Sequence, residues 1–265
     1  MIDPVKLVDA VLAGPLAQEP YIAALPMYDW PETRAETDAL WVTLRDEFRK
    51  CGISAPEHLT RRNGDLPPVP GGIRDTSGAE LAPDPASLPP DAFDLAVLWQ
   101  HPNLLLAQTC WGPLELWLNG CVRVVGQDDY SGMEGGDGEM YSSALVMRRE
   151  EASSHVTEGG PSLIALLTNK RLAYNVADSM SGYLALQRDL ESQGSSLAIF
   201  SGHIISGGHR NSIRAVAEGR ADVTAIDAKT WALAQQFEPT ARALSVAGWT
   251  GKRKGLPFVT AKRPS

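Results

Sequence analysis

Short apolar runs and longer amphipathic stretches alternate along most of the chain. The apolar runs predict strands at 21–27, 103–107, 121–125, 143–147, 171–176, 197–200, 222–226 and 244–247. The amphipathic stretches between them predict helices at 31–51, 113–118, 183–190, 211–218 and 231–236. Because strand and helix follow one another with short turns, the pattern predicts an α/β fold built on parallel strands with right-handed crossovers.

Two segments interrupt this alternation. Residues 1–19 form an amphipathic N-terminal extension, with one expected helix before Gly14 and Pro15. Residues 60–92 contain seven prolines and few large apolar side chains, so they predict a long loop with a short hairpin around 73–81. Since the α/β pattern resumes after this loop, we interpret it as an excursion within one lobe. We predict a first lobe of 20–143 plus 245–265 and a second of 144–244.

Composition excludes some classes of function. The 265 residues include 32 acidic and 24 basic side chains, for a net charge of −8, whereas a general nucleic-acid-binding protein carries a basic excess. No apolar run approaches the roughly 18 residues of a membrane span. The N-terminus as written has no basic region before an apolar stretch, which predicts a cytoplasmic protein; an export signal outside this sequence would make it periplasmic.

The cysteines and histidines do not form a metal-binding pattern. Cys51, Cys110 and Cys121 include no C-x-x-C pair, and we expect all three to be free thiols. Cys110 and Cys121 are expected at opposite ends of parallel strands, too far apart for a disulfide. His203 and His209 have no glutamate or cysteine companions, so neither a metal nor a cofactor is predicted.

Three turns share one design, in which small polar residues follow an apolar strand and open a helix. They are the segments 108–110, 179–182 and 206–209. Ligands of open α/β sheets bind beyond the carboxyl ends of the strands, and helix N-termini there offer unpaired N–H groups to an anion. Ser179 and Ser181 would add hydroxyl donors, and Gly182 would allow close backbone approach. Ordinary helix capping is the alternative explanation for each turn.

Single polar residues leave their roles open. His209 follows two glycines and could reach a ligand or bond to backbone, whereas His203 is expected in the core. Asp222 and Asp227 lie at the start and end of one predicted strand, so Asp227 falls at the ligand end and could instead cap the next helix. A carboxylate beside an anion requires that the ligand also carry a donor or a positive charge. Phosphate-loop, dinucleotide and esterase motifs are absent.

In this order, the segments resemble the phosphonate-binding family of ABC transporter solute receptors. The matching stretches are 27–29, 104–110, 141–143, 175–183, 206–209, 216–222, 226–231 and 255–258. The resemblance implies a two-lobed type II periplasmic-binding-protein-like fold with a central ligand cleft, which captures a small oxyanion such as a phosphonate or phosphate. It also implies an ABC permease as partner.

The resemblance assigns ligand contacts by position. It places Tyr28, Ser179, Ser181, His209 and either Asp222 or Asp227 against the phosphonate. Gln108, Thr109, Gly182 and Tyr183 are further candidates. A non-catalytic solute-binding protein is therefore our leading hypothesis. A cytosolic biosynthetic enzyme that reuses the fold, with His209 and Asp227 as its acid/base pair, and a ligand-sensing regulatory domain are the alternatives.

Overall fold

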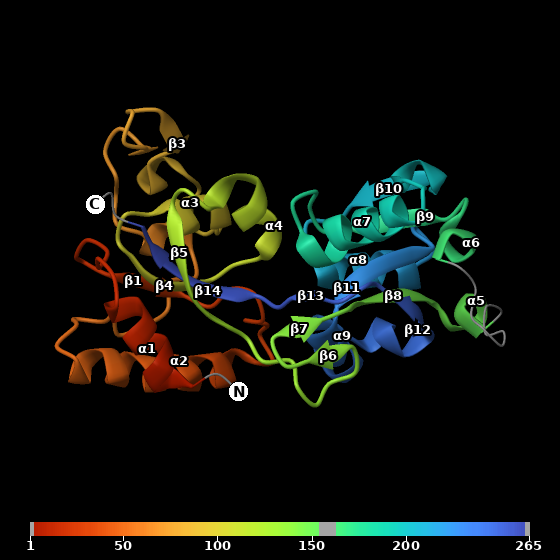
Figure 1. Ribbon diagram of the computed structural model, residues 1–265, viewed down its shortest axis with the longest axis horizontal. Coiled ribbons are helices and arrows are strands. Elements are labelled where there is room, and N and C mark those ends of the chain that lie inside the picture. Colours follow the sequence, from red (N-terminus) through yellow and green to blue (C-terminus); the bar gives the residue numbers. More distant parts are fainter. Residues whose placement is uncertain (1–2, 154–162, 263–265) are drawn as a thin grey trace. The chain divides into compact units, whose positions relative to one another are not determined.

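A computed structural model describes residues 3–153 and 163–262 of the chain. It divides into two compact units, of which unit 1 comprises residues 1–128 and 256–265 and unit 2 comprises residues 129–255. Both are mixed α/β, as predicted (Figure 1). The predicted boundaries at 143/144 and 244/245 fall inside unit 2, because the strands that begin at these positions pair with each other in its central sheet.

Unit 1 is built on a four-stranded sheet in the order β1-β4-β14-β5. Its strands and helices are α1 (Pro4–Leu12), β1 (Ile22–Ala24), α2 (Arg34–Lys50), β2 (Ile73–Arg74), β3 (Glu80–Ala82), α3 (Leu95–Gln100), β4 (Leu104–Gln108), α4 (Trp111–Pro113), the π-helix η3 (Leu114–Leu118), β5 (Val122–Gln127) and β14 (Pro257–Ala261). Short 3-10 helices, η1 (Asn63–Asp65) and η2 (Pro85–Ser87), lie in the long loop together with the predicted hairpin β2–β3.

Helices cover both faces of this sheet. Leu7, Val11 and Phe48 of α1 and α2 pack with Leu105 and Phe258 on one face. On the other, α3 and η3 pack against other residues of the same strands (Figure 1). The N-terminal segment is therefore part of the core of unit 1 and not an extension, because α1 buries an apolar stripe there.

β4 and β5 are parallel, as predicted, but another strand separates them. β1 pairs in parallel with β4, but β14 lies between β4 and β5 and is antiparallel to both. β4 and β5 therefore run in the same direction without touching. A strand from the far C-terminal end fills the space between them, which local hydrophobic pattern does not reveal.

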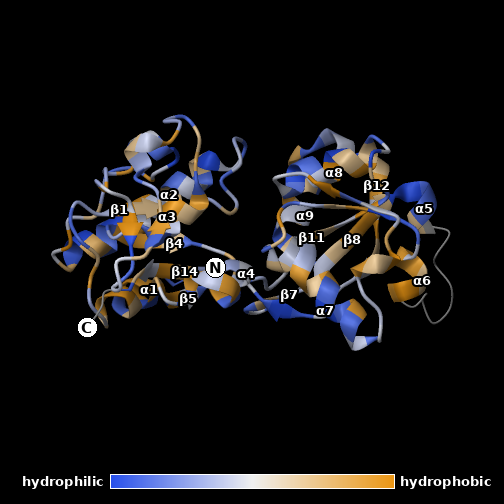
Figure 2. Cartoon of the chain, turned by 90° about the horizontal axis from the view of Figure 1, so that it is seen from above, coloured by the Kyte–Doolittle hydropathy of each residue, from blue (hydrophilic) through white to orange (hydrophobic). Residues whose placement is uncertain are grey.

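Unit 2 is built on a five-stranded sheet in the order β10-β9-β11-β8-β12. Its elements are β6 (Gly136–Asp137), β7 (Met140–Tyr141), β8 (Ser143–Arg148), α5 (Arg149–Ser153), α6 (Leu163–Leu167), β9 (Arg171–Tyr174), the π-helix η4 (Met180–Leu184), α7 (Ala185–Ser192), η5 (Leu197–Ile199), β10 (Gly202–Ile205), α8 (His209–Ala217), β11 (Val223–Asp227), α9 (Ala228–Phe237), η6 (Pro239–Ala243), β12 (Leu244–Trp249) and β13 (Arg253–Lys254). In Figure 2 the apolar strands β8 and β11 lie between α8 and α9 on one side and α6 and α7 on the other.

One predicted strand of unit 2 is wrong. Residues 197–200 were expected to be a strand, but Leu197–Ile199 is a 3-10 turn that Ser196 caps by accepting a hydrogen bond from the Ala198 N–H. This turn buries Phe200 in the core, and the strand β10 begins only at Gly202.

Candidate functional site

Three helix N-termini of unit 2 meet at one edge of its sheet. β9, β10 and β11 are parallel, and β9 lies between the other two. Helix η4 follows β9, helix α8 follows β10 and helix α9 follows β11, so all three begin at the carboxyl ends of these strands. Because N–H groups in a helix's first turn have no partner within the helix, this edge concentrates donors and positive dipole ends.

The predicted serines lie at the first of these N-termini. Ser179 is the N-cap of η4, and its Oγ accepts a hydrogen bond from the Gly182 N–H at 3.1 Å. The two serine oxygens lie 3.5 Å apart. Both side chains are buried, with Ser179 4% and Ser181 3% exposed. The capping alternative is therefore correct for Ser179, and its hydroxyl proton still has no fixed acceptor at normal hydrogen-bond distance.

His209 joins this pair from the next helix. It is the first residue of α8, and its Nε2 lies 2.8 Å from the Ser181 Oγ. The same nitrogen lies 3.6 Å from Oδ2 of Asp227. Burial lowers the pKa of His209 below its usual value, although the nearby Asp227 carboxylate opposes this. The imidazole is therefore neutral near pH 7.

The carboxylate decides which nitrogen of the neutral ring carries the proton. A lone pair on Nε2 would face the negative Asp227, whereas an N–H there is attracted to it. The Nε2–H then donates to the Ser181 Oγ, and Nδ1 carries the lone pair. Both serine oxygens thus accept hydrogen bonds from the protein, and both hydroxyl protons are left to donate to a ligand.

Asp227 anchors the third N-terminus. Its Oδ1 accepts a hydrogen bond from the Thr230 N–H at 2.9 Å and so caps α9. The carboxylate is 3% exposed. The sequence left open whether Asp227 caps a helix or faces the site; it does both, because its second oxygen lies beside His209.

Gly182 is required by a residue that sequence reasoning missed. A Cβ at Gly182 would lie 2.1 Å from the Asn175 Oδ1 and 3.2 Å from the His209 Cε1. The glycine therefore makes room for the Asn175 side chain and not only for a ligand. Asn175 follows β9 directly, so its position after a strand was the available signal. Its Oδ1 is buried and has no hydrogen-bond partner in the described structure.

The candidates in unit 1 lie at the corresponding ends of its parallel strands. Tyr28 follows β1, and its carbonyl accepts a hydrogen bond from the Thr33 Oγ1 at 2.7 Å. Gln108 ends β4 and its Nε2 donates to Asp128 at 3.4 Å. Thr109 is fully buried, and its Oγ1 has no hydrogen-bond partner among the described residues.

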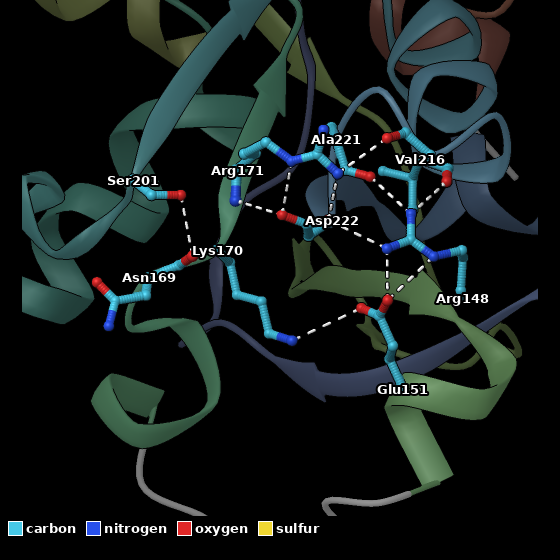
Figure 3. A network of polar contacts seen from close by, with 10 residues as sticks. Arg148, Glu151, Asn169, Lys170, Arg171, Ser201, Val216, Ala221 and Asp222 are labelled. Atoms are coloured by element: carbon cyan, nitrogen blue, oxygen red, sulfur yellow. Dashed lines mark hydrogen bonds and ion pairs between the residues drawn. The ribbon is translucent and has the colours of Figure 1, made fainter.

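Asp222 does not join the cluster, which corrects one of the two acidic candidates. It precedes β11 and so lies at the opposite end of that strand from Asp227. Its carboxylate binds Arg171 at 2.7 Å and Arg148 at 3.0 Å (Figure 3). Hydrogen bonds from Arg171, together with those from Arg148, hold the pKa of Asp222 well below its usual range. This carboxylate joins β8, β9 and β11 and has a structural role.

Tyr183, a predicted site residue, and His203, which was not one, both lie against the ring of Tyr174. Tyr183 is half-buried, and its ring centroid lies 4.7 Å from that of Tyr174 at the end of β9. His203 was expected in the core, but it is exposed because β10 is an edge strand whose alternate side chains face solvent. Its ring makes edge contacts with Tyr174 and Phe200.

Comparison with known proteins identifies the family. The family model of the periplasmic substrate-binding protein of phosphonate ABC transporters matches residues 122–263, more than half of the chain. The chain belongs to this family. The predicted resemblance is thus confirmed, and the match lends no support to the biosynthetic-enzyme or regulatory alternatives. No curated protein sequence matches the chain.

Three solved structures share the fold of this chain. A structure of PhnD1 from Prochlorococcus marinus in complex with methylphosphonate matches with a TM-score of 0.59 and 14% identity over 91% of this chain and 75% of that chain. A Xanthomonas citri protein bound to chloride ion matches with a TM-score of 0.56 and 15% identity, over 92% of this chain and 78% of that chain. A binding protein component of a Pseudomonas aeruginosa ABC phosphonate transporter matches with a TM-score of 0.55 and 14% identity, over 94% of this chain and 70% of that chain.

Within residues 3–153 and 163–262, no group of three or more metal-ligating side chains is found. No helix in these ranges has the length and apolar character needed to cross a membrane.

The geometry of the cluster also differs from that of a hydrolytic triad. In a Ser-His-Asp triad the serine and the aspartate bind opposite nitrogens of the imidazole, so that the aspartate orients the base. Here Ser181 and Asp227 both approach Nε2 of His209, while Nδ1 is buried and has no partner in the described structure. The histidine therefore has no orienting carboxylate behind it.

Proposed function

We propose that this protein is a non-catalytic receptor that binds a phosphonate or phosphate-like oxyanion through a cluster of residues at the three helix N-termini of unit 2. This cluster consists of Ser179, Ser181, Gly182, His209 and Asp227. The observation that carries the proposal is the convergence of three helix N-termini on two buried serine hydroxyls. The Ser179 Oγ accepts from the Gly182 N–H, and the Ser181 Oγ lies 2.8 Å from the His209 Nε2. The protons of the two hydroxyls, with unpaired backbone N–H groups, make a donor set suited to an oxyanion.

The cluster binds an anion without placing a basic side chain on it. Arg210 follows His209 in α8, and its guanidinium binds Glu238 at 2.7 Å. Arg214 of the same helix binds Glu238 at 2.9 Å. Both guanidinium groups are thus paired with one carboxylate that is itself buried. Ligand affinity in this proposal comes from hydroxyl and backbone donors, as in other anion sites at helix N-termini.

Unit 1 supplies further proposed contacts. Thr109 offers a buried hydroxyl with no partner in the described structure, and Tyr28 and Gln108 lie at the ends of neighbouring parallel strands. We assign these three residues to ligand binding as predictions. Substitution of Thr109 by valine removes the hydroxyl and keeps the shape, so it should weaken ligand binding without loss of stability.

The test compares the wild-type protein with the Ser179→Ala/Ser181→Ala variant. Isothermal titration with methylphosphonate, phosphite and phosphate measures the dissociation constant, and thermal shift confirms binding to the folded state. Each hydrogen bond to a charged ligand contributes roughly 1.5–3 kcal/mol, so the double variant should bind about 100-fold more weakly or worse. If no oxyanion binds the wild-type protein, or if the variant binds equally well, the proposal is wrong.

The family suggests where and with what the protein works. Its members are periplasmic substrate-binding proteins of ABC transporters. An ABC permease is accordingly the proposed partner, and delivery of the ligand to that permease in the periplasm is the proposed role. Uptake of methylphosphonate by cells with and without this protein would test it, with the double serine variant as the control for ligand binding.

A further inference from the structure

Two buried atoms beside the serine pair lack hydrogen-bond partners in the described structure. They are the Asn175 Oδ1 and the His209 Nδ1. The Asn175 Oδ1 and the His209 Cε1, the carbon bonded to Nδ1, both lie within 3.2 Å of the point where a Gly182 Cβ would be. The two atoms therefore flank the same glycine, inside the proposed anion site.

Both atoms are acceptors. The Asn175 Oδ1 is an amide carbonyl oxygen, and the His209 Nδ1 carries a lone pair because Asp227 favours the proton on Nε2. The Asp227 carboxylate adds a third acceptor group to the cluster. A fully deprotonated oxyanion offers acceptors only, so it would repel these groups and leave them unsatisfied. A buried acceptor without a partner destabilises a complex strongly.

We propose that Asn175 determines specificity in this site, because its carbonyl accepts a hydrogen bond from an acidic hydroxyl of the ligand. The site thus takes the oxyanion as its protonated monoanion, with one P–OH group. The serine hydroxyls and helix N–H groups bind the unprotonated oxygens, and Asn175 binds the protonated one. This inference rests on the proposed oxyanion-binding function and names the form of the ligand that the site selects.

Asn175 is well placed for this role by the backbone around it. The backbone carbonyl of Asn175 accepts a hydrogen bond from the Gly207 N–H at 3.0 Å. This bond joins the end of β9 to the turn that precedes His209. The side chain rests on Gly182, where no Cβ could fit. Its amide is therefore held between the two turns that carry Ser181 and His209.

The test uses two ligands of the same shape and charge. The monoanion of methylphosphonate and methanesulfonate differ at the reactive end in one respect, since only the phosphonate carries a proton on oxygen at neutral pH. We expect the wild-type protein to bind methanesulfonate at least about tenfold more weakly in isothermal titration, because a buried acceptor loses its donor.

Three variants assign the discrimination to Asn175. Asn175→Ala should reduce the ratio of the two dissociation constants about tenfold, whereas Asn175→Asp, which keeps an acceptor oxygen, should preserve it. Ser179→Ala should weaken both ligands equally and leave the ratio unchanged, because its hydroxyl donates to either anion. Thermal unfolding confirms that each variant is folded.

The outcomes separate this inference from the proposed function. If the wild-type protein binds neither ligand, nor phosphate, the proposed function fails and the inference with it. If methylphosphonate binds and methanesulfonate binds equally well, the function stands and the selection of a protonated ligand is overturned. If the discrimination survives in Asn175→Ala and disappears in Asp227→Asn, the assignment to Asn175 is overturned.

Discussion

Addition of one methyl group at Gly182 should disrupt the ligand site while the fold survives. In Gly182→Ala the new Cβ would lie 2.1 Å from the Asn175 Oδ1. Because non-bonded heavy atoms settle at roughly 3.5 Å, the amide of Asn175 must retreat by about 1 Å or more. The His209 Cε1, at 3.2 Å from the same point, restricts the direction of that movement.

Two opposing effects set the change in stability. Overpacking of a buried position costs about 1–3 kcal/mol. Gly182 is helical and does not have a positive φ, so alanine gains up to about 1 kcal/mol in helix propensity. We therefore expect the free energy of unfolding to fall by about 0–3 kcal/mol. The affinity for methylphosphonate should fall at least about tenfold, since a hydrogen bond to a charged ligand is displaced.

Urea denaturation and isothermal titration measure the two effects separately. Asn175→Ala combined with Gly182→Ala removes the contact, and this double variant should be more stable than Gly182→Ala alone. Gly120→Ala is the matched control, because nothing lies within 4 Å of its Cβ position. If Gly182→Ala retains wild-type stability and affinity, the Asn175 side chain does not pack against this glycine.

Three further outcomes follow from groups outside the cluster. Asp222→Ala should destabilise unit 2 by about 1–3 kcal/mol in urea denaturation, since Arg171 loses its carboxylate partner and Arg148 keeps only Glu151. It should not change the dissociation constant for methylphosphonate. Burial lowers the pKa of His101 below its ordinary value of 6.5, so stability should fall as the pH drops below 6.5, and His101→Gln should flatten that dependence in thermal unfolding. Thiol titration of the denatured, unreduced protein should find three free groups, Cys51, Cys110 and Cys121.

Local chemistry made much of the site predictable. Ser179 and Asp227 follow strands and precede helices, which is the pattern of N-cap residues, and the structure has both as caps. The polarity of β11 was also sufficient to place Asp227, and not Asp222, at the carboxyl end of the strand. Asp222 became a candidate only through the family resemblance. Its partners Arg148 and Arg171 come from two other strands, and sequence spacing carries no sign of that pairing.

Long-range pairing explains what the sequence could not predict. β14 lies in the sheet of unit 1 between β4 and β5, although it follows β5 by over a hundred residues in the chain. A hydrophobic run in the sequence does not indicate which strands it will pair with. Asn175 was missed for the same reason. Its importance depends on its position against Gly182 across a turn, where His209 approaches the same glycine from another helix. Neither approach has a signature in the order of residues.

The structure also suggests why an acidic residue could belong in the proposed anion site. Asp227 caps α9, so its charge is partly satisfied by backbone N–H groups before any ligand arrives. Its remaining oxygen holds the proton of His209 on Nε2, and that proton binds the oxygen of Ser181. The carboxylate therefore orients the Ser181 hydroxyl toward a ligand through the imidazole. A negative group can favour anion binding in this way, because it fixes the direction of a neutral donor.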